Sequence, residues 1–212
     1  MMLAMRVYKF LPAKFALKTL YERRLKISTF EDLNDPFDLT PFRMSDKIRR
    51  RAYRKFRKYL TSKYGVMSFS ETWGDPVAWA HYADKHRGIC LGFEIPEGRC
   101  IPVSYVPEPL PFRTYKTAKE FLHHLVATKY ANWNYEREVR WFGKLRGEED
   151  GLYYYPLGDD LQLRQVIAGH RCKVSRAAVM RVLSGVAKDV ELIKARAAFT
   201  SFQIKTDKRG WK

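Results

Sequence analysis

The sequence predicts an α+β fold in which short mixed or antiparallel sheets are flanked by helices. Apolar or alternating segments of strand type recur along the 212 residues, and amphipathic segments of helical spacing lie between them. Most connections are short and carry Gly, Pro, Asn or Asp. A hydrophobic share of 46% and an aromatic share of 15% exclude a largely disordered chain. Because no linker or repeat interrupts the sequence, we expect a single domain over residues 1–212.

The elements follow from local patterns. Pro76 after Asp75 marks a helix start, and Ser175 is a candidate N-cap. The expected helices span 13–23, 43–63, 76–86, 116–132 and 175–186. The expected strands span 6–10, 25–28, 65–70, 89–95, 101–106, 135–144, 152–155, 161–168, 190–193 and 197–204, and a loose basic tail follows.

Residues 43–63 stand out as a basic helical insertion, because they hold ten Lys or Arg and a single acid, Asp46. Ile48, Ala52, Phe56 and Tyr59 recur among the charges at helical spacing, and Ser45 is the expected N-cap. A solvated face and a nucleic-acid contact are both open interpretations. The candidate nucleic-acid-binding residues are Arg49, Arg50, Arg51, Arg54, Lys55, Arg57 and Lys58.

The overall charge favours an anionic partner. Forty Lys and Arg against 23 Asp and Glu give a net charge of +17, so nucleic acid or another polyanion is a plausible partner. Three widely spaced cysteines without a CxxC pair fit neither a disulfide framework nor a zinc ribbon, and indicate a reducing cytoplasm. We expect no signal peptide and no membrane insertion, because no apolar stretch of that length occurs.

The segment 135–144 carries the strongest candidates for catalysis. If it is a strand, Glu136, Glu138 and Arg140 project from one face. Two neighbouring carboxylates suit acid–base work, and a glutamate can stabilise an oxocarbenium-like transition state by its charge. The competing interpretation is a surface ladder of Glu and Arg with little effect on stability.

Weaker candidates lie in three other segments. In the NDPFD loop, Asn34 and Asp35 can hold a turn or face a cleft, and Phe37 is expected to anchor the loop in the core. Ser68 and Ser70 alternate along a strand and could bind a phosphate or a ribose hydroxyl. On the helix 76–86, Trp79 and Tyr82 could stack on a ring of a ligand, although core packing is favoured for Trp79. On the same helix, His81 could carry a proton, and His86 could cap the helix end. Gly-rich phosphate loops and metal-binding motifs are not found in the sequence.

Four stretches, in this order, resemble a bacterial family known as domain of unknown function 2971. They are YKF at 8–10, LKISTFEDLNDPFD at 25–38, VMSFSETWGDPVAWAHYADKHRGICLGFEI at 66–95 and WNYEREVRW at 133–141. The similarity covers nearly the whole chain, and only the basic block 43–63 looks peculiar to this member.

The order of elements also resembles an ADP-ribosyltransferase fold, as in toxins that use NAD. That resemblance implies NAD as a substrate, with Lys9 on the first strand, the loop from Ser28 to Asp38 beside the nicotinamide, and Glu138 as the catalytic residue. We expect no metal, because the sequence holds no metal-binding motif. Glu136 would orient the acceptor, and Arg140 would bind substrate beside it. The resemblance further implies a role in toxin–antitoxin or anti-phage systems, with an antitoxin or another protein as partner. The alternatives are a non-catalytic nucleic-acid-binding module and an inactive protein-interaction unit.

Overall fold

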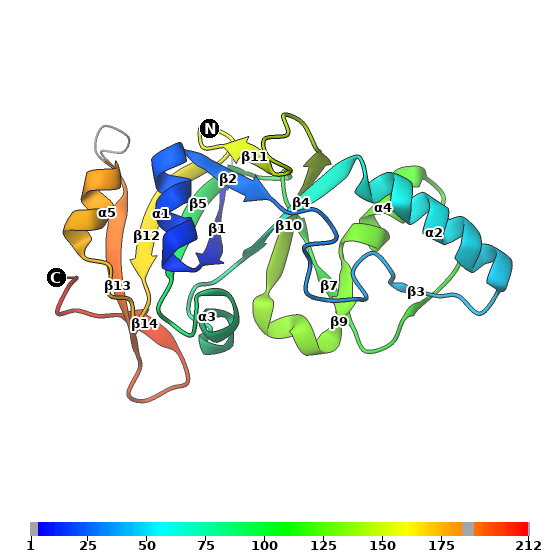
Figure 1. The fold of residues 1–212 in the computed structure, drawn as a ribbon. Helices are drawn as coiled ribbons and strands as arrows, with labels where there is room; N and C mark the ends of the chain where they lie inside the picture. The colour runs from blue at the N-terminus through cyan, green and yellow to red at the C-terminus, as the bar shows by residue number, and fades with distance from the viewer. Residues whose placement is uncertain (1–3, 184–188, 212) are drawn as a thin grey trace. The chain divides into compact units, whose positions relative to one another are not determined.

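The computed structural model describes residues 4–183 and 189–211, and its architecture is mixed α+β, as the sequence predicts. The backbone contacts divide the chain into two compact units (Figure 1). The first unit comprises Met1–Leu25, Phe69–Arg99 and Tyr155–Lys212, and the second comprises Lys26–Ser68 and Cys100–Tyr154. The expectation of a single domain over 1–212 stays a prediction.

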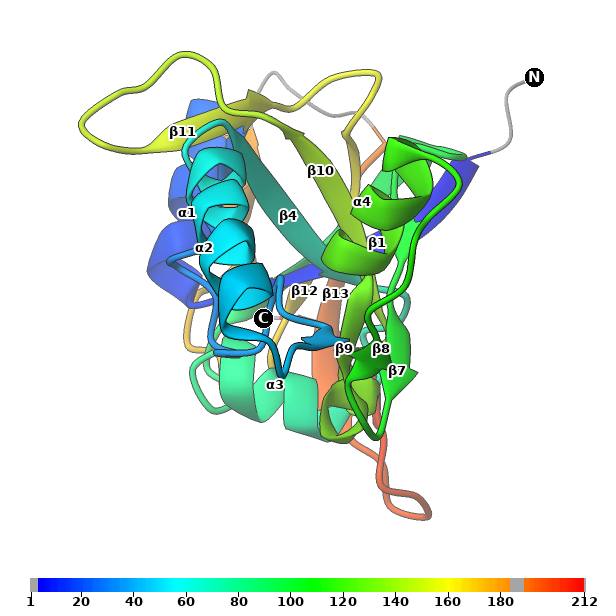
Figure 2. The ribbon, with the colours of Figure 1, turned by 90° about the vertical axis from the view of Figure 1, so that its right-hand side faces the viewer.

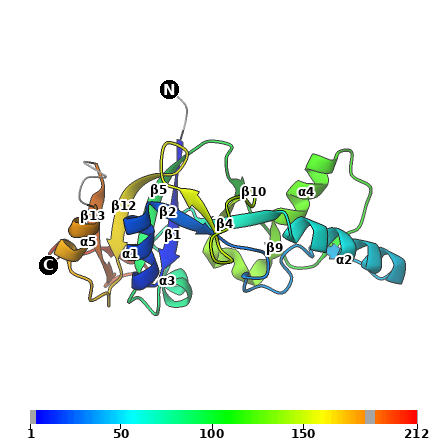
Figure 3. The same ribbon diagram turned by 45° about the horizontal axis from the view of Figure 1, so that its top comes forward.

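A mostly antiparallel sheet forms the centre of the first unit. Its strand order is β14 (Ile204–Thr206), β13 (Glu191–Ala197), β12 (Gln162–Ala168), β5 (Ile89–Pro96) and β1 (Ala4–Leu11). Strands β12 and β13 are parallel, and β1 also pairs with the end of β4 at Ser70. Helices α1 (Ala13–Glu22) and α5 (Arg176–Leu183) lie side by side on this unit (Figure 3).

One row of side chains crosses this sheet and forms the core beneath helix α3 (Pro76–Tyr82). Ile193, Ile167, Cys90 and Phe10 are in register on successive strands, so they project from one face. Trp79 of α3 is fully buried in the same cluster and meets the ring of Phe10 edge-on at 5.2 Å. The interpretation of Trp79 as a core residue is therefore confirmed.

Helix α3 begins as predicted but ends early. The Asp75 carboxylate accepts hydrogen bonds from the backbone N–H groups of Val77 and Ala78. The helix stops at Tyr82 instead of reaching His86, because the chain turns through positive φ angles at residues 84–86. His86 stacks on the ring of Trp79, with centroids 6.4 Å apart, and its backbone N–H donates to the Trp79 carbonyl at 3.2 Å. Its expected place at the last turn of the helix is wrong, because the helix ends at Tyr82.

The second unit contains short ladders. Strand β10 (Glu138–Lys144) lies between β4 (Tyr64–Ser70) and β6 (Ile101–Pro102). Two parallel pairs join β3 (Phe42–Arg43) to β8 (Leu110–Pro111) and β7 (Ser104–Val106) to β9 (Thr128–Tyr130). Strands β2 (Arg24–Ile27) and β11 (Tyr153–Pro156), which pair with each other, each contain residues of both units.

Helices α2 (Lys47–Thr61) and α4 (Ala118–Val126) pack on one apolar core in this unit, and β4 and β10 are seen between them in Figure 2. Tyr53 and Leu60 are the buried side chains of α2, and the Tyr53 hydroxyl donates a hydrogen bond to the Leu39 carbonyl. The helix predicted within 43–63 is thus confirmed, but its N-cap is Asp46 and not Ser45.

Three boundaries differ from the sequence prediction. The helix expected over 116–132 is replaced after Val126 by strand β9 and the 3₁₀ helix η1 (Ala131–Glu136), so the strand expected from residue 135 begins only at Glu138. The strand expected over 197–204 is a bend between β13 and β14. The C-terminal tail, which was expected to be loose, contacts the rest of the first unit, because the Trp211 indole donates a hydrogen bond to the Val174 carbonyl at 2.9 Å. The end of the helix expected over 175–186 lies outside the described residues.

Candidate functional site

A cluster of buried charges in the second unit contains both predicted catalytic glutamates. Lys129 lies on β9, and η1 then folds the chain back so that Glu136 Oε2 lies 2.6 Å from Lys129 Nζ. Arg137 adopts the left-handed conformation, with φ of 43°, and starts β10 in a new direction. Glu138 therefore also reaches Lys129, at 3.3 Å. The Lys129 ammonium also lies 4.8 Å from the ring centroid of Trp133.

Arg140 holds the other side of this cluster, and its side chain is only 1% exposed. Its Nε and Nη2 donate to the two carboxylate oxygens of Glu138, at 2.7 and 3.0 Å. Nη2 also donates to Asp38 Oδ1 at 2.7 Å, and Nη1 donates to the carbonyl of Val126 at 2.8 Å. The guanidinium thus links β10, the NDPFD loop and the end of α4 by hydrogen bonds. Two of these bonds form a bidentate contact with the Glu138 carboxylate.

The cluster keeps Glu138 ionised. Burial raises the pKa of the Glu138 carboxyl, but the charge and hydrogen bonds of Arg140, the charge of Lys129 and a hydrogen bond from Ser68 lower it to about 2. For Lys129, burial lowers the pKa, but the charges of Glu138 and Glu136 outweigh it, so the pKa is raised. Burial also raises the pKa of Asp38 despite Arg140, and no donor among the described residues reaches its Oδ2.

This arrangement suits a fixed negative charge better than proton transfer. A general acid or base needs a pKa near the working pH, whereas Glu138 stays ionised. Both of its oxygens accept hydrogen bonds from cations, and its backbone N–H donates to the Tyr105 hydroxyl at 2.8 Å. The interpretation of Glu136, Glu138 and Arg140 as an exposed surface ladder is wrong, because all three residues are buried.

The NDPFD loop contacts this cluster through Asp38, and its other acid, Asp35, holds a turn. Asp35 is buried, and its Oδ1 accepts the backbone N–H of Phe37 at 2.9 Å, so the predicted turn is confirmed. Asn34 lies at the surface. The expectation that Phe37 anchors the loop is wrong: its side chain is 64% exposed, and the fully buried Leu39 anchors it instead.

The two predicted serines of the second unit have different surroundings. Ser68 contributes the hydrogen bond that helps to hold Glu138 ionised. Ser28 forms an isolated bridge with Val66 through two backbone hydrogen bonds of 2.9 Å. Ser68, Glu136, Glu138 and Arg140 are therefore brought together by the fold.

The remaining predicted substrate-binding residues belong to the first unit. Lys9 lies on β1 opposite Leu91, and Ser70 Oγ donates to the carbonyl of Thr72 at 2.9 Å. His81 is exposed and meets the half-buried ring of Tyr82 at 6.0 Å. Trp79, the last of these predicted substrate-binding residues, donates its indole N–H to the carbonyl of Trp73 at 2.6 Å, which fits a core residue.

Helix α2 presents the chain's most concentrated exposed charge. Its predicted nucleic-acid-binding residues are all exposed except Arg57, which is half-buried. Arg54, Lys55 and Lys58 lie three, four and seven residues after Arg51, so the four residues form a single stripe along the helix. Within residues 4–183 and 189–211, none of the lysines or arginines of α2 pairs with a carboxylate.

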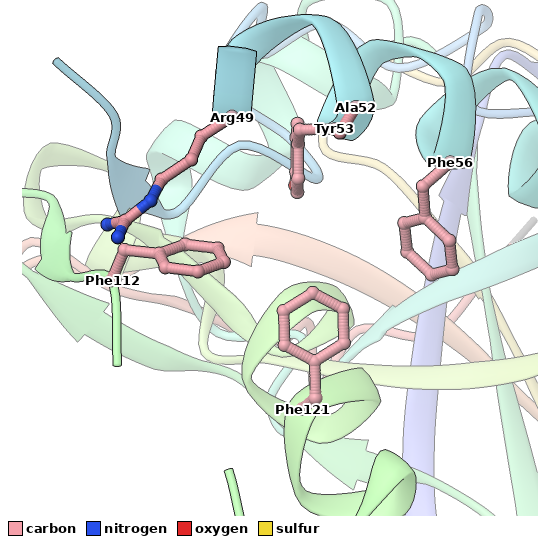
Figure 4. Close-up of a pocket in the computed structure, with 6 residues that line it drawn as sticks. All are labelled: Arg49, Ala52, Tyr53, Phe56, Phe112 and Phe121. Atoms are coloured by element: carbon pink, nitrogen blue, oxygen red, sulfur yellow. The ribbon is translucent and has the colours of Figure 1, made fainter. Parts of the chain in front are cut away.

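On the face of α2 opposite to this stripe lies a shallow aromatic groove of about 240 Å³. Figure 4 shows the residues that line it: Arg49, Ala52, Tyr53 and Phe56 from α2, Phe112 from the segment after β8, and Phe121 from α4. The rings of Phe56 and Phe112 are 37% and 39% exposed, and the Arg49 guanidinium lies 5.6 Å from the centroid of Phe112.

Sequence patterns could not identify several of these residues. Lys129 lies in a segment that reads as helix, and Tyr105 lies between prolines, so neither is marked by a motif. Asp38 belongs to the NDPFD loop, where its acidic character was the only available signal. Phe112 and Phe121 are distant in sequence from α2, and only the packing of α2 beside α4 brings them together.

We predict that Glu138→Gln destabilises the protein by about 3–5 kcal/mol, because it leaves Arg140 and Lys129 with an uncompensated buried charge. Urea unfolding measures this free energy. Glu94→Gln is the matched control, since Glu94 is a partly exposed carboxylate between Arg6 and Arg164. The control should lose about 1 kcal/mol or less. Equal losses for the two variants would show that the buried cluster contributes no more than a surface pair.

The lowered pKa of Glu138 also predicts how the stability difference between wild type and Glu138→Gln depends on pH. Because its pKa is lowered from 4.5 to about 2 on folding, the Glu138 carboxylate stabilises the protein above pH 4.5 and loses that effect as the pH falls toward 2. The difference in unfolding free energy between wild type and Glu138→Gln should therefore shrink between pH 5 and pH 3, taken as rough working points. A difference that stays constant over that range would mean that the folded protein does not depress this pKa.

Comparisons with known proteins add no relative from which a function could be carried over. No family model, curated protein or solved structure matches this chain. Among the described residues, no helix is long and apolar enough to cross a membrane, and no group of three or more His, Cys, Asp or Glu could hold a metal ion. The function is therefore inferred from the buried charge cluster and the basic surface of α2.

Proposed function

We propose that this protein binds nucleic acid, and that the exposed basic face of α2 forms the contact with the phosphates. The observation that carries the proposal is the stripe of Arg51, Arg54, Lys55 and Lys58, which is exposed and has no carboxylate partner in the described part of the chain. Unpaired cations along one line match the regular spacing of charges on a phosphate backbone.

The concentration of charge favours binding over a general role in solubility. Residues 43–63 hold ten of the 40 Lys and Arg, so a quarter of the basic residues fall within 21 of 212 positions. Charges that serve solubility alone need no such clustering. Keeping these cations together costs free energy through mutual repulsion, and a polyanion removes that repulsion when it binds.

We predict that replacing Arg51, Arg54, Lys55 and Lys58 together by Gln weakens nucleic-acid binding and flattens its salt dependence. Each phosphate contact contributes about 0.7–0.9 to the slope of log K against log salt, so losing four contacts should reduce the slope by about three. Arg50 stays unchanged because it donates hydrogen bonds to the carbonyls of Met44 and Ser45 at the start of α2. Fluorescence anisotropy with a labelled oligonucleotide over a salt series measures both quantities.

A matched control separates placement from net charge. Lys14, Lys144, Lys205 and Lys208 are exposed and lie outside α2, so replacing them by Gln removes the same total charge. The slope should then stay close to that of the wild type. Equal flattening in both variants would assign the binding to net charge alone, and a wild type that binds no nucleic acid would remove this function.

The buried cluster supports a second candidate, cleavage of NAD with transfer of ADP-ribose to water or another acceptor. Here Glu138 is the fixed negative charge that favours a developing cation on the ribose, and its lowered pKa keeps it ionised near neutral pH. The bond between ribose C1′ and the nicotinamide nitrogen breaks, neutral nicotinamide leaves with the electron pair, and the acceptor oxygen attacks C1′ and releases its proton to the solvent. The order of elements expected from the sequence, which resembles that of an ADP-ribosyltransferase fold, also favours this candidate.

For this second candidate, we predict nicotinamide release by the wild type and a loss on the order of a hundredfold or more in Glu138→Gln. Because that variant also disturbs buried charges, circular dichroism must show that it is folded at the assay temperature. Glu136→Gln keeps the contacts of Glu138 with Arg140 and should lose less activity when water is the acceptor. Wild-type turnover in folded Glu138→Gln would remove Glu138 from the mechanism. A wild type without turnover or nucleic-acid binding would favour a protein-interaction unit.

A further inference from the structure

The β13–β14 hairpin carries two aromatic rings at its tip that the described chain leaves open to solvent. Its loop, residues 198–203, is closed by a hydrogen bond of 2.9 Å from the Ala198 N–H to the Gln203 carbonyl. Phe199 and Phe202 lie in this loop and are 93% and 99% exposed, more than any other large hydrophobic side chain of the described residues. Figures 1 and 2 show the loop projecting beyond the strands of the first unit. Exposed apolar surface of this kind marks a contact with a partner.

The base of the hairpin is anchored, so the tip is held in place. Ala197 pairs with Ile204 in the antiparallel ladder, and Ile204 is buried in the core beneath α3. The backbone N–H of Ile204 also donates to the Gly74 carbonyl at 2.8 Å. The two rings are therefore displayed from a fixed support and do not belong to a frayed chain end.

Two cations adjoin the rings on one face of the hairpin. Arg196 and Lys205 are directly opposite each other in the ladder, so their side chains project from the same face and repel each other. The Arg196 guanidinium lies 4.9 Å from the ring centroid of Phe199, which places this basic face beside the tip. In the described part of the chain, neither cation forms an ion pair with a carboxylate, and Asp207 pairs with Arg209 instead. The hairpin thus combines exposed rings with cations that an external anion can bind.

The order of these features along the hairpin favours one kind of partner. The tip, residues 197–203, carries no charge, whereas the whole segment 194–209 holds five Lys or Arg and a single acid. An apolar tip with cations behind it matches an anionic membrane surface, because rings enter the boundary between headgroups and acyl chains while cations meet lipid phosphates. A single-stranded nucleic acid needs cations and rings that alternate along a groove. A protein partner would need a pocket complementary to the convex tip, whereas a lipid surface deforms around it.

We propose that the β13–β14 hairpin docks this protein on a membrane surface rich in anionic phospholipid. Phe199 and Phe202 enter the headgroup boundary, and Arg196 and Lys205 bind the phosphates of neighbouring lipids. The contact is peripheral, because only the tip of the hairpin reaches the lipid. The inference goes beyond nucleic-acid binding by α2 and does not depend on it, since the hairpin belongs to the first unit and α2 to the second.

The test measures cosedimentation with vesicles of phosphatidylcholine, with and without phosphatidylglycerol, over a salt series. Wild type should bind the mixed vesicles at least about tenfold more tightly than phosphatidylcholine alone, as expected when two cations meet an anionic surface. The variant Phe199→Ala with Phe202→Ala should bind the mixed vesicles at least about tenfold more weakly than wild type, because it lacks the apolar surface of two rings. Its salt dependence should stay that of the wild type, because its charge is unchanged.

Two controls assign the effect of the rings to the hairpin. Tyr21→Ala with Phe37→Ala also removes two exposed rings, of 77% and 64% exposure, but outside the hairpin, and should bind like wild type. All variants are also measured with the four cations of the α2 stripe replaced by Gln, so that attraction of α2 to anionic lipid does not mask the rings. Circular dichroism should show no change in the ring variant, because both of its substitutions lie at exposed positions.

The variant Arg196→Gln with Lys205→Gln tests the charge separately. It should bind the mixed vesicles about tenfold or more weakly and show a reduced salt dependence, while binding to phosphatidylcholine alone stays unchanged. Lys14→Gln with Lys144→Gln removes the same charge at exposed positions outside the hairpin. This control should lose about threefold or less, because the attraction of a cation to the surface falls off within a Debye length.

The outcomes separate this inference from its alternatives. A wild type that does not bind mixed vesicles, or a ring variant that binds them as tightly as wild type, overturns it. A ring variant that loses affinity for labelled oligo-dT but not for vesicles assigns the hairpin to nucleic acid. A dimeric wild type and a monomeric ring variant in analytical ultracentrifugation, with equal vesicle binding, assign the rings to a second copy of the chain. Both results overturn the membrane contact, whereas loss of the nucleic-acid function of α2 would not change the vesicle result.

Discussion

The second unit depends on the hydrogen bonds that the buried guanidinium of Arg140 makes. It is held by hydrogen bonds to Glu138, Asp38 and the Val126 carbonyl, so it fixes a strand, a loop and a helix end at once. A planar group with several fixed donors can do this, whereas a lysine at the same place offers no such fork. Because the interior disfavours any unpaired charge, the acids and the cations must be present together.

The protein uses charge in two opposite ways. Inside the second unit, two cations face three carboxylates at hydrogen-bond distance, and the geometry leaves Glu138 ionised. On α2, all the cations except the half-buried Arg57 are exposed, and none forms an ion pair with a carboxylate in the described chain, so an external anion would relieve their mutual repulsion. The first arrangement favours a rigid interior, and the second favours an association that is sensitive to salt.

Much of the secondary structure could be predicted from local pattern. Strands β1, β5 and β12 and helices α1 and α2 lie where apolar spacing indicates, because each is long enough for its period to be read. The region after Val126 could not be predicted in this way, because β9 and η1 are too short to show a hydrophobic period and the segment also fits a helix. The same uncertainty hid Lys129, and the burial of Glu136 and Glu138 depends on that turn.

By itself, the sequence determined the α+β class, the helix within the basic block, the turn at Asp35 and the caps at Asp75 and Ser175, because each depends on residues close together in the chain. Only the tertiary structure decided which charges are buried and which are exposed. Arg140 and Arg51 are the same residue type, and they differ because Asp38, 102 residues before Arg140, folds against its guanidinium, whereas no acid faces Arg51 in the described structure. The groove is likewise a tertiary feature, since its rings come from segments that carry no local signal of one another.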